Sequence, residues 1–265
     1  MILLLSPSKT LDYETPLPAG LACKATEPAY TARAAELIEV LRPLPPARIA
    51  ELMDLSDKLA ALNAARYGAW STKAKASNSR PAVLAFNGDV YDGLQAATLS
   101  VEDLAWAQDH VVILSGLYGA LRPLDKLQPY RLEMGAKLEN PRGQDLYDFW
   151  GDEVANYLNG RMPSRRSATF GEPIIVNLAS QEYFKVADRR SLKARVVECV
   201  FEDWRGDGYR IISFFAKRAR GLMARHAIQR RAATLDDLRT FALDGYAFDP
   251  QASQPDRLMF RRRQA

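Results

Sequence analysis

The sequence predicts an α/β protein: a single compact domain spanning residues 1–265, with a mixed, largely parallel sheet surrounded by helices. Short apolar runs typical of buried strands alternate with longer segments of helical periodicity, which is the pattern of a parallel sheet. The chain is 48% hydrophobic and 26% charged, so it carries enough apolar side chains for one packed core. It contains no repeat, low-complexity tract or linker at which two domains would divide.

The first seventy residues predict one strand and three helices. Ile2–Leu5 is apolar throughout, as in a buried strand, and the polar loop Ser6–Thr10 leaves its carboxyl end. The spacing of apolar residues and prolines predicts helices over 27–41, 46–52 and 57–67. Ser56 is well placed to cap the third helix, so we expect a helical hairpin near 46–68.

The middle of the chain predicts a pair of parallel strands. The apolar runs 81–86 and 111–114 flank a helical segment, 101–109, that fits a crossover between parallel strands. Extended chain, an amphipathic helix and a polar surface loop are then expected at 130–138, 145–158 and 162–172, respectively.

The last third of the chain predicts the remaining strands and one long basic helix. Strands are expected at 173–177, 195–203, 209–215 and 257–263, and helices at 181–187 and 216–231. A turn with two glycines, 205–208, joins the second and third of these strands, so we expect them to pair as a hairpin.

Positive charge is concentrated in one part of the chain. The formal net charge is only +4 and the isoelectric point is near 9.0. Between Arg205 and Arg231, however, eight Lys and Arg residues accompany a single acid, Asp207, whereas 87–109 holds five Asp and Glu residues and no Lys or Arg. We therefore expect one basic face and a separate acidic face.

The cysteines and the N-terminus favour a cytoplasmic protein. Cys23 and Cys199 are far apart and form no CxxC pair, which indicates a reducing compartment. The apolar start of the chain is too short for a signal peptide and lacks a basic flank. No segment approaches the roughly 20 apolar residues that span a bilayer, so we expect no membrane partner.

One face of the basic helix predicts an anion-binding stripe. Lys217, Arg220, Gly221 and Arg225 recur every three to four residues. The absence of a side chain at Gly221 would let another backbone or a phosphate approach closely. Concentrated cations of this kind bind the DNA backbone without reading its sequence. The alternative is a solvated surface helix without a partner.

Four polar clusters follow predicted strand ends or turns. They lie at 6–10, 122–125, 129–134 and 177–183. If the strands are parallel, the clusters would meet at one edge of the sheet and line a cleft. Five cations would make this cleft positive: Lys9, Arg122, Arg131, Lys185 and Lys217. The alternative is that Arg122 with Asp125, and Arg131 with Glu133, form local salt bridges.

The hairpin is similar to a helix-hairpin-helix DNA-binding motif. Leu55 would pack the turn, the backbone at Ser56 would face a phosphate, and Lys58 would add positive charge. The usual turn glycines are absent, and Asp54 and Asp57 oppose a phosphate. An ordinary pair of core helices is the alternative.

No standard catalytic or cofactor motif occurs, so the sequence assigns neither a catalytic residue nor a cofactor. His110 and His226 lack neighbours at metal-ligand spacing, and we assign no metal. An all-oxygen metal site would need four distant carboxylates to meet in space: Asp12, Asp125, Glu133 and Glu182.

Seven segments carry a family resemblance. They are SPSKTLDY at 6–13, SDKLAALNAARY at 56–67, GDVYDGL at 88–94, LSGLYGALRPLD at 114–125, PYRLEMG at 129–135, NLASQEYF at 177–184 and ISFFAKRARGLMAR at 212–225. In this order they closely resemble the YaaA family of bacterial peroxide-stress proteins. The chain departs from that family in a basic insert around Arg161–Arg166 and in its Arg-rich end.

The resemblance implies a compact α/β fold peculiar to the family and a place in the cytosol. It also implies a protein that helps bacteria to survive hydrogen peroxide by limiting free intracellular iron. DNA binding through a helix-hairpin-helix and a basic cleft is the third implication. Limiting iron and binding DNA would both protect the cell, because ferrous iron near DNA makes damaging radicals from peroxide.

Three functional hypotheses follow. The first is a protein that grips double-stranded or distorted DNA by its backbone, through Ser56, Lys58, Lys9, Arg131, Lys217, Arg220 and Arg225. The second is an enzyme acting on a nucleotide or another phosphorylated substrate, through Lys9, Tyr130, Arg131, Glu133 and Glu182. The third, direct sequestration of iron, has the least support because soft and imidazole ligands are lacking.

Overall fold

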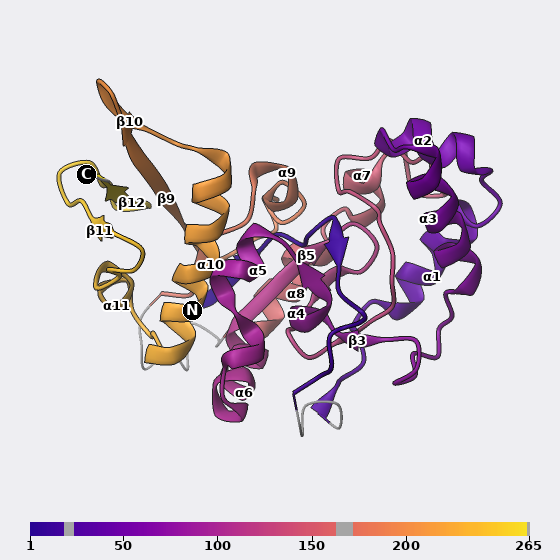
Figure 1. Ribbon diagram of the computed structural model, residues 1–265, viewed down its shortest axis with the longest axis horizontal. Helices are drawn as coiled ribbons and strands as arrows, with labels where there is room; N and C mark the ends of the chain where they lie inside the picture. Colours follow the sequence, from indigo (N-terminus) through magenta and orange to yellow (C-terminus); the bar gives the residue numbers. More distant parts are fainter. Residues whose placement is uncertain (19–23, 163–171, 264–265) are drawn as a thin grey trace.

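An eight-stranded sheet forms the centre of the molecule in the computed structural model, which describes residues 1–18, 24–162 and 172–263 (Figure 1). The strands lie in the order β11-β12-β9-β8-β1-β5-β6, and β10 pairs with β9. Their bounds are β1 Ile2–Leu5, β5 Val111–Ser115, β6 Gly119–Leu121, β8 Ile174–Asn177, β9 Arg195–Arg205, β10 Gly208–Arg210, β11 Tyr246–Phe248 and β12 Arg257–Arg262.

The sheet is mixed and mostly parallel, as the sequence predicts. Strand β1 is parallel to both of its neighbours, β5 and β8, and β9 is parallel to β8 and β12. The pairs β5–β6, β9–β10 and β11–β12 are antiparallel. Every residue of β1 and β5 is buried, which explains why β1 is apolar throughout and β5 is apolar up to its last residue, Ser115. The carboxyl ends of β1 and β8 therefore open onto the same edge of the sheet.

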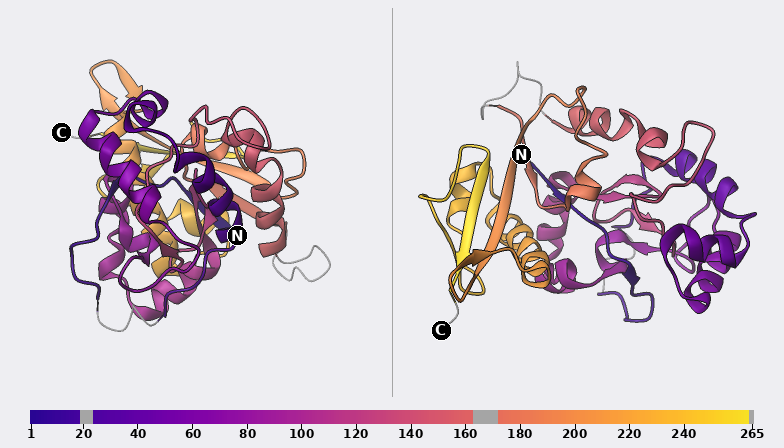
Figure 2. Two further views of the ribbon diagram at one scale, coloured as in Figure 1. Left: turned by 90° about the vertical axis from the view of Figure 1, so that its right-hand side faces the viewer. Right: turned by 90° about the horizontal axis from the view of Figure 1, so that it is seen from above.

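Helices surround the sheet and extend the molecule at one end. Their bounds are α1 Thr31–Leu41, α2 Pro46–Met53, α3 Asp57–Ala69, α4 Ala82–Ala85, α5 Asp89–Leu94, α6 Val101–His110, α7 Leu146–Trp150, α8 Glu153–Arg161, α9 Gln181–Phe184, α10 Ser213–Arg230 and α11 Leu235–Arg239, with a 3₁₀ turn, η2, at Ala96–Thr98. Figures 1 and 2 place α1–α3 at one end and α11 with β9–β12 at the other. Helices α5 and α10 lie side by side between these ends.

The segment 81–86 is not a strand, which corrects the prediction. Its middle is the short helix α4, and only its flanks pair: β3 (Arg80–Pro81) with β7 (Lys126–Leu127), and β4 (Phe86–Asn87) with β2 (Thr10–Leu11). Ala82 and Ala85 are fully buried, and periodicity does not distinguish so short a buried helix from a strand. The predicted crossover through α6 therefore does not connect these strands, and β5 pairs with β1.

Two other predicted elements differ from the structure for local reasons. The helix expected over 145–158 is divided into α7 and α8, because Gly151 takes a left-handed φ of +47° after α7. No strand forms over 130–138, whose backbone runs irregularly along the cleft described below. The surface loop predicted at 162–172 and the basic insert lie mainly outside the described residues.

The second strand of the predicted hairpin is shorter than expected. Strand β10 ends at Arg210, and α10 begins at Ser213, so Phe214 and Phe215 are helical. Aromatic and β-branched residues at 211–215 favour a strand locally, and the tertiary packing of α10 outweighs that preference. The long basic helix thus extends three residues further toward the hairpin than the sequence predicts.

Candidate functional site

A cleft of about 490 Å³ opens at the carboxyl ends of β1 and β8. It is lined by the loop 6–10, by 87–91 at the start of α5, by 130–133, by Ser180, Glu182 and Tyr183, and by Lys217 and Arg220 of α10. Three of the four polar clusters predicted to converge therefore do so. Parallel strands bring their carboxyl ends to one edge, which is where α/β proteins bind ligands.

Hydrogen bonds hold the loops of the cleft together. The Ser180 backbone N–H donates to Ser6 Oγ at 2.9 Å, joining the loop after β8 to the loop after β1. The Tyr91 hydroxyl of α5 donates to the backbone oxygen of Ser6 at 3.0 Å. Burial raises the pKa of Tyr91 well above its ordinary value, so this hydroxyl stays a neutral donor. The loop 6–10 is therefore fixed from two sides.

Glu133 neutralises two of the predicted cations. Lys9 Nζ lies 2.7 Å from Glu133 Oε2, and an Arg131 guanidinium nitrogen lies 2.8 Å from Oε1. Burial raises the pKa of Glu133, but hydrogen bonds from Lys9 and Arg131, with their positive charges, outweigh burial and leave the pKa below its ordinary value. Arg131 and Glu133 are thus a salt bridge that also lines the cleft, so both interpretations of this pair hold.

Two cations line the cleft from its α10 wall, Lys217 and Arg220. Lys217 and Arg220 are three residues apart, so their side chains lie on neighbouring turns of one side. Lys217 is exposed and Arg220 is half-buried. Within the described part of the chain, neither side chain has a hydrogen-bond or ion-pair partner. Burial lowers the pKa of Arg220, and the charge of Glu198 opposes this only partly.

Helix α5 packs against α10 at backbone distance. A Cβ atom built on Gly221 would lie 1.8 Å from the backbone oxygen of Val90, and one on Gly93 would lie 2.1 Å from that of Arg218. Gly221 therefore admits the backbone of α5 rather than a phosphate. The contact also brings Asp89 of α5 into the cleft beside the α10 cations. The expectation of separate basic and acidic faces is wrong at this point.

Arg225 lies outside the cleft, although the sequence places it in the same stripe. Its guanidinium donates to the backbone oxygens of Leu94 and Gln95 at 3.0 and 3.1 Å and to Thr98 Oγ1 at 2.9 Å. It thus satisfies carbonyl groups at the end of α5 and stabilises the contact between the two helices.

Arg122 and Lys185, two further cations expected in the cleft, also lie elsewhere. Arg122 binds the fully buried Asp125 at 3.0 Å, and Thr26 Oγ1 donates to the same carboxylate at 2.6 Å. The local interpretation of this pair is therefore correct. Lys185 Nζ lies 4.2 Å from the centre of the Tyr147 ring, a cation–π contact.

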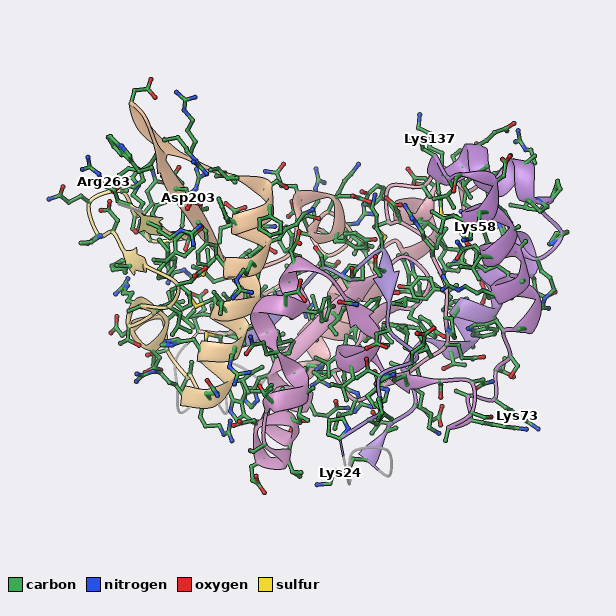
Figure 3. The ribbon with its side chains drawn as sticks, viewed as in Figure 1. Lys24, Lys58, Lys73, Lys137, Asp203 and Arg263 are labelled. Carbon is green, nitrogen blue, oxygen red and sulfur yellow. The ribbon has the colours of Figure 1, made fainter. Side chains whose placement is uncertain are left out.

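The hairpin forms as predicted and lies apart from the cleft. Helices α2 and α3 are joined by Asp54 in a left-handed conformation, and Leu55 donates its N–H to the Ala50 oxygen. Ser56 is the N-cap residue of α3 and is exposed, as is Lys58 (Figure 3). The views in Figures 1 and 2 agree that α3 and α10 are separated.

Among the residues that the structure describes, one hydrogen bond links the hairpin to the cleft. The Tyr67 hydroxyl, near the end of α3, donates to the backbone oxygen of Arg131. Lys58 lies nine residues before Tyr67, which is about 14 Å along a helix that rises 1.5 Å per residue. Lys58 and the contact of α3 with the cleft segment therefore lie near opposite ends of α3.

The described residues offer neither a membrane-spanning helix nor a cluster of metal ligands. None of their helices combines the length and apolar character needed to cross a membrane. Likewise, among residues 1–18, 24–162 and 172–263, no three His, Cys, Asp or Glu side chains are grouped so as to hold a metal ion.

The fold and the cleft define an α/β protein with a cleft at the carboxyl edge of its sheet, lined by both cationic and acidic side chains. Residues 1–252 match the family described as peroxide stress protein YaaA, and the chain belongs to this family. Proteins named UPF0246 are similar over all 265 residues and their own full length, with 63% identity in Leptothrix cholodnii, 60% in Delftia acidovorans and 59% in Paracidovorax citrulli. The family resemblance seen in the sequence is confirmed.

Proposed function

We propose that this peroxide-stress protein binds DNA in the cytoplasm through the phosphate backbone. Three exposed lysines support the proposal: Lys9 and Lys217 at the mouth of the cleft and Lys58 at the hairpin. The observation that carries it is that the exposed ammonium of Lys217 makes no ion pair with any described residue. Exposed lysines bind phosphates without reading bases, so the affinity should depend on salt and not on sequence.

A duplex would lie across the mouth of the cleft rather than inside it. The major groove alone is about 12 Å wide, so a whole duplex is too large for a space of about 490 Å³. Ser56 and Lys58 would contact a phosphate at the N-terminus of α3, where backbone N–H groups face outward. Both Lys9 and Arg131 pair with Glu133, but the Lys9 side chain is 64% exposed and that of Arg131 only 15%. Because Arg220 is also half-buried, we assign smaller roles on the duplex to the two arginines.

Such binding explains protection against peroxide in chemical terms. Ferrous ions associated with DNA phosphates generate radicals next to the bases when peroxide arrives. A protein whose lysines occupy those phosphates displaces the cations. We propose that this displacement lowers DNA damage and helps to limit the pool of reactive iron.

The salt dependence of duplex binding tests the proposal. Three lysine–phosphate contacts predict that log affinity falls with log salt at a slope of about −2.7, since each contact contributes about −0.9. Fluorescence anisotropy of a labelled duplex measures this slope. Lys217→Ala should reduce it to about −1.8, whereas Arg230→Ala, an exposed cation at the far end of α10, should leave it unchanged. Salt-independent affinity, or none, contradicts the proposal.

A further inference from the structure

We propose that the interior of the cleft binds a small phosphate monoester that carries hydroxyl groups, such as a nucleotide or a sugar phosphate. This site shares Lys217 with the duplex surface at the cleft mouth, but its centre lies deeper, at Arg220, and it does not depend on DNA binding. Three features of the cleft carry the inference: an arginine that makes no ion pair with any described residue, carboxylate oxygens without a hydrogen-bond partner among the same residues, and a volume suited to a small ligand.

Arg220 is the centre of the proposed site. Arg220 is half-buried and lines the cleft, and within the described residues its guanidinium has no hydrogen bond or ion pair. Partial burial of a charge favours an anionic partner. A phosphate would supply two parallel hydrogen bonds in the geometry that the guanidinium presents. Lys217, on the neighbouring turn, would bind the same phosphate as a second positive charge.

The carboxylates define the other end of the ligand. Glu182 accepts one hydrogen bond, from the Gly135 N–H to Oε1 at 3.0 Å, and its second oxygen has no partner in the described part of the chain. Asp89 also lines the cleft, and neither of its carboxylate oxygens has a partner in the described part of the chain. Carboxylate oxygens accept hydrogen bonds from hydroxyl groups and repel phosphates. They would therefore bind the sugar and orient the phosphate toward α10.

The size and setting of the cleft agree with this class of ligand. Sites for small molecules and cofactors measure about 300 to 1,000 Å³, and the cleft measures about 490 Å³. It lies at the carboxyl ends of two adjacent parallel strands, where α/β proteins place nucleotides. The backbone contact between α5 and α10 fixes the cationic wall relative to Asp89, so the site is formed in advance of binding.

Isothermal titration calorimetry of the full chain tests the inference with matched probes. We expect adenosine 5′-monophosphate or ribose 5-phosphate to bind at least about tenfold more tightly than adenosine or ribose, because charge-assisted phosphate contacts supply most of the affinity. Arg220→Gln and Lys217→Ala should each weaken the phosphorylated probe by about tenfold. Arg230→Ala, outside the cleft on the same helix, should not.

Duplex binding by the same variants separates this inference from the proposed function. Arg220→Gln should leave duplex affinity within about twofold, whereas Lys58→Ala should weaken duplex binding by several-fold and leave the phosphorylated probe unaffected. Lys217 is exposed, so its variant remains informative if Arg220→Gln fails to fold. The inference is overturned if no phosphorylated probe binds, if phosphate-free probes bind equally, or if both cleft variants bind like the wild type.

Discussion

Single residues show why a predicted stripe of cations divides into two roles. Lys217 and Arg220 line the cleft, whereas Arg225 binds carbonyl oxygens at the end of α5. Five residues separate Arg220 from Arg225, which corresponds to about 140° around a helix of 3.6 residues per turn. The sequence supplies the charges and their angular positions, but it does not show which neighbour each side meets. Four of the seven predicted DNA-binding residues share the cleft, and hairpin residues Ser56 and Lys58 do not.

The carboxylate of Glu133 should limit the affinity of the cleft for DNA. Glu133→Gln would release Lys9 and Arg131 from their ion pairs, so we expect duplex affinity to rise about two- to fivefold at low salt. Glu139→Gln, an exposed acid outside the cleft, is the matched control. Anisotropy at pH 7 measures the effect. Equal affinities for both variants would mean that Lys9 and Arg131 do not approach phosphate.

The same substitution predicts a dependence on pH. The pKa of Glu133 lies below its ordinary value of 4.5, so the carboxylate stays charged as the pH falls toward that value. The ion pairs contribute stability above this range and lose it only as the pH falls through the lowered pKa. The difference between wild type and Glu133→Gln should therefore persist at pH 5 and close under more acidic conditions, in both thermal unfolding and duplex binding.

Asp125 should be essential for stability rather than for binding. Its fully buried carboxylate accepts hydrogen bonds from Arg122 and Thr26. Asp125→Ala would leave Arg122 without its partner and should lower the free energy of unfolding by about 3 kcal/mol or more. Glu27→Ala removes the exposed ion pair to Lys126 and should change stability little. Urea unfolding measures the free energy of unfolding of both variants. Similar losses of stability would mean that burial of the Asp125 carboxylate does not make its ion pair more important.

At the scale of elements, the sequence predicts where strands occur better than it predicts the order in which they lie in the sheet. Strands β1, β5 and β8 follow from short apolar runs, because side chains buried on both faces of a sheet are mostly apolar; polar residues, Ser115 and Asn177, occur only at the carboxyl ends of β5 and β8. The same rule mistakes the buried helix α4 for a strand. The order of the sheet depends on contacts between segments more than a hundred residues apart, such as Leu3 with Val111, and local patterns do not encode such pairs.

The contact between α5 and α10 should be sensitive to one methyl group. Gly221→Ala would place a Cβ atom against the backbone oxygen of Val90, so the helices must separate and unfolding stability should fall by about 1 to 3 kcal/mol. Gly160→Ala in α8 is the control, because no atom lies within 4 Å of the added Cβ. There we expect a gain of about 0.5 to 1 kcal/mol. Thermal unfolding distinguishes these opposite signs.

At the scale of the whole molecule, the hairpin and the cleft are two separate surfaces of one protein. The sequence predicts each of them, but their spacing follows from the way α3 meets the segment 130–133 through Tyr67. Lys58 lies at one end of α3 and this contact at the other. A duplex that touches both surfaces would bind with the combined contribution of the lysines, which is roughly additive when sites are more than about 10 Å apart.

The lysines that contribute to duplex affinity should also determine how well the protein protects DNA from peroxide. In a mixture of supercoiled plasmid, ferrous iron and hydrogen peroxide, the wild type should slow the conversion to nicked circles in proportion to the fraction of DNA that it covers. Lys58→Ala combined with Lys217→Ala should lose both duplex affinity and protection, and raising the salt concentration should remove protection from the wild type in parallel. Arg230→Ala should protect like the wild type. If the double variant no longer binds DNA and still protects, the protein acts on iron or peroxide directly, and the role of the lysines in protection is refuted.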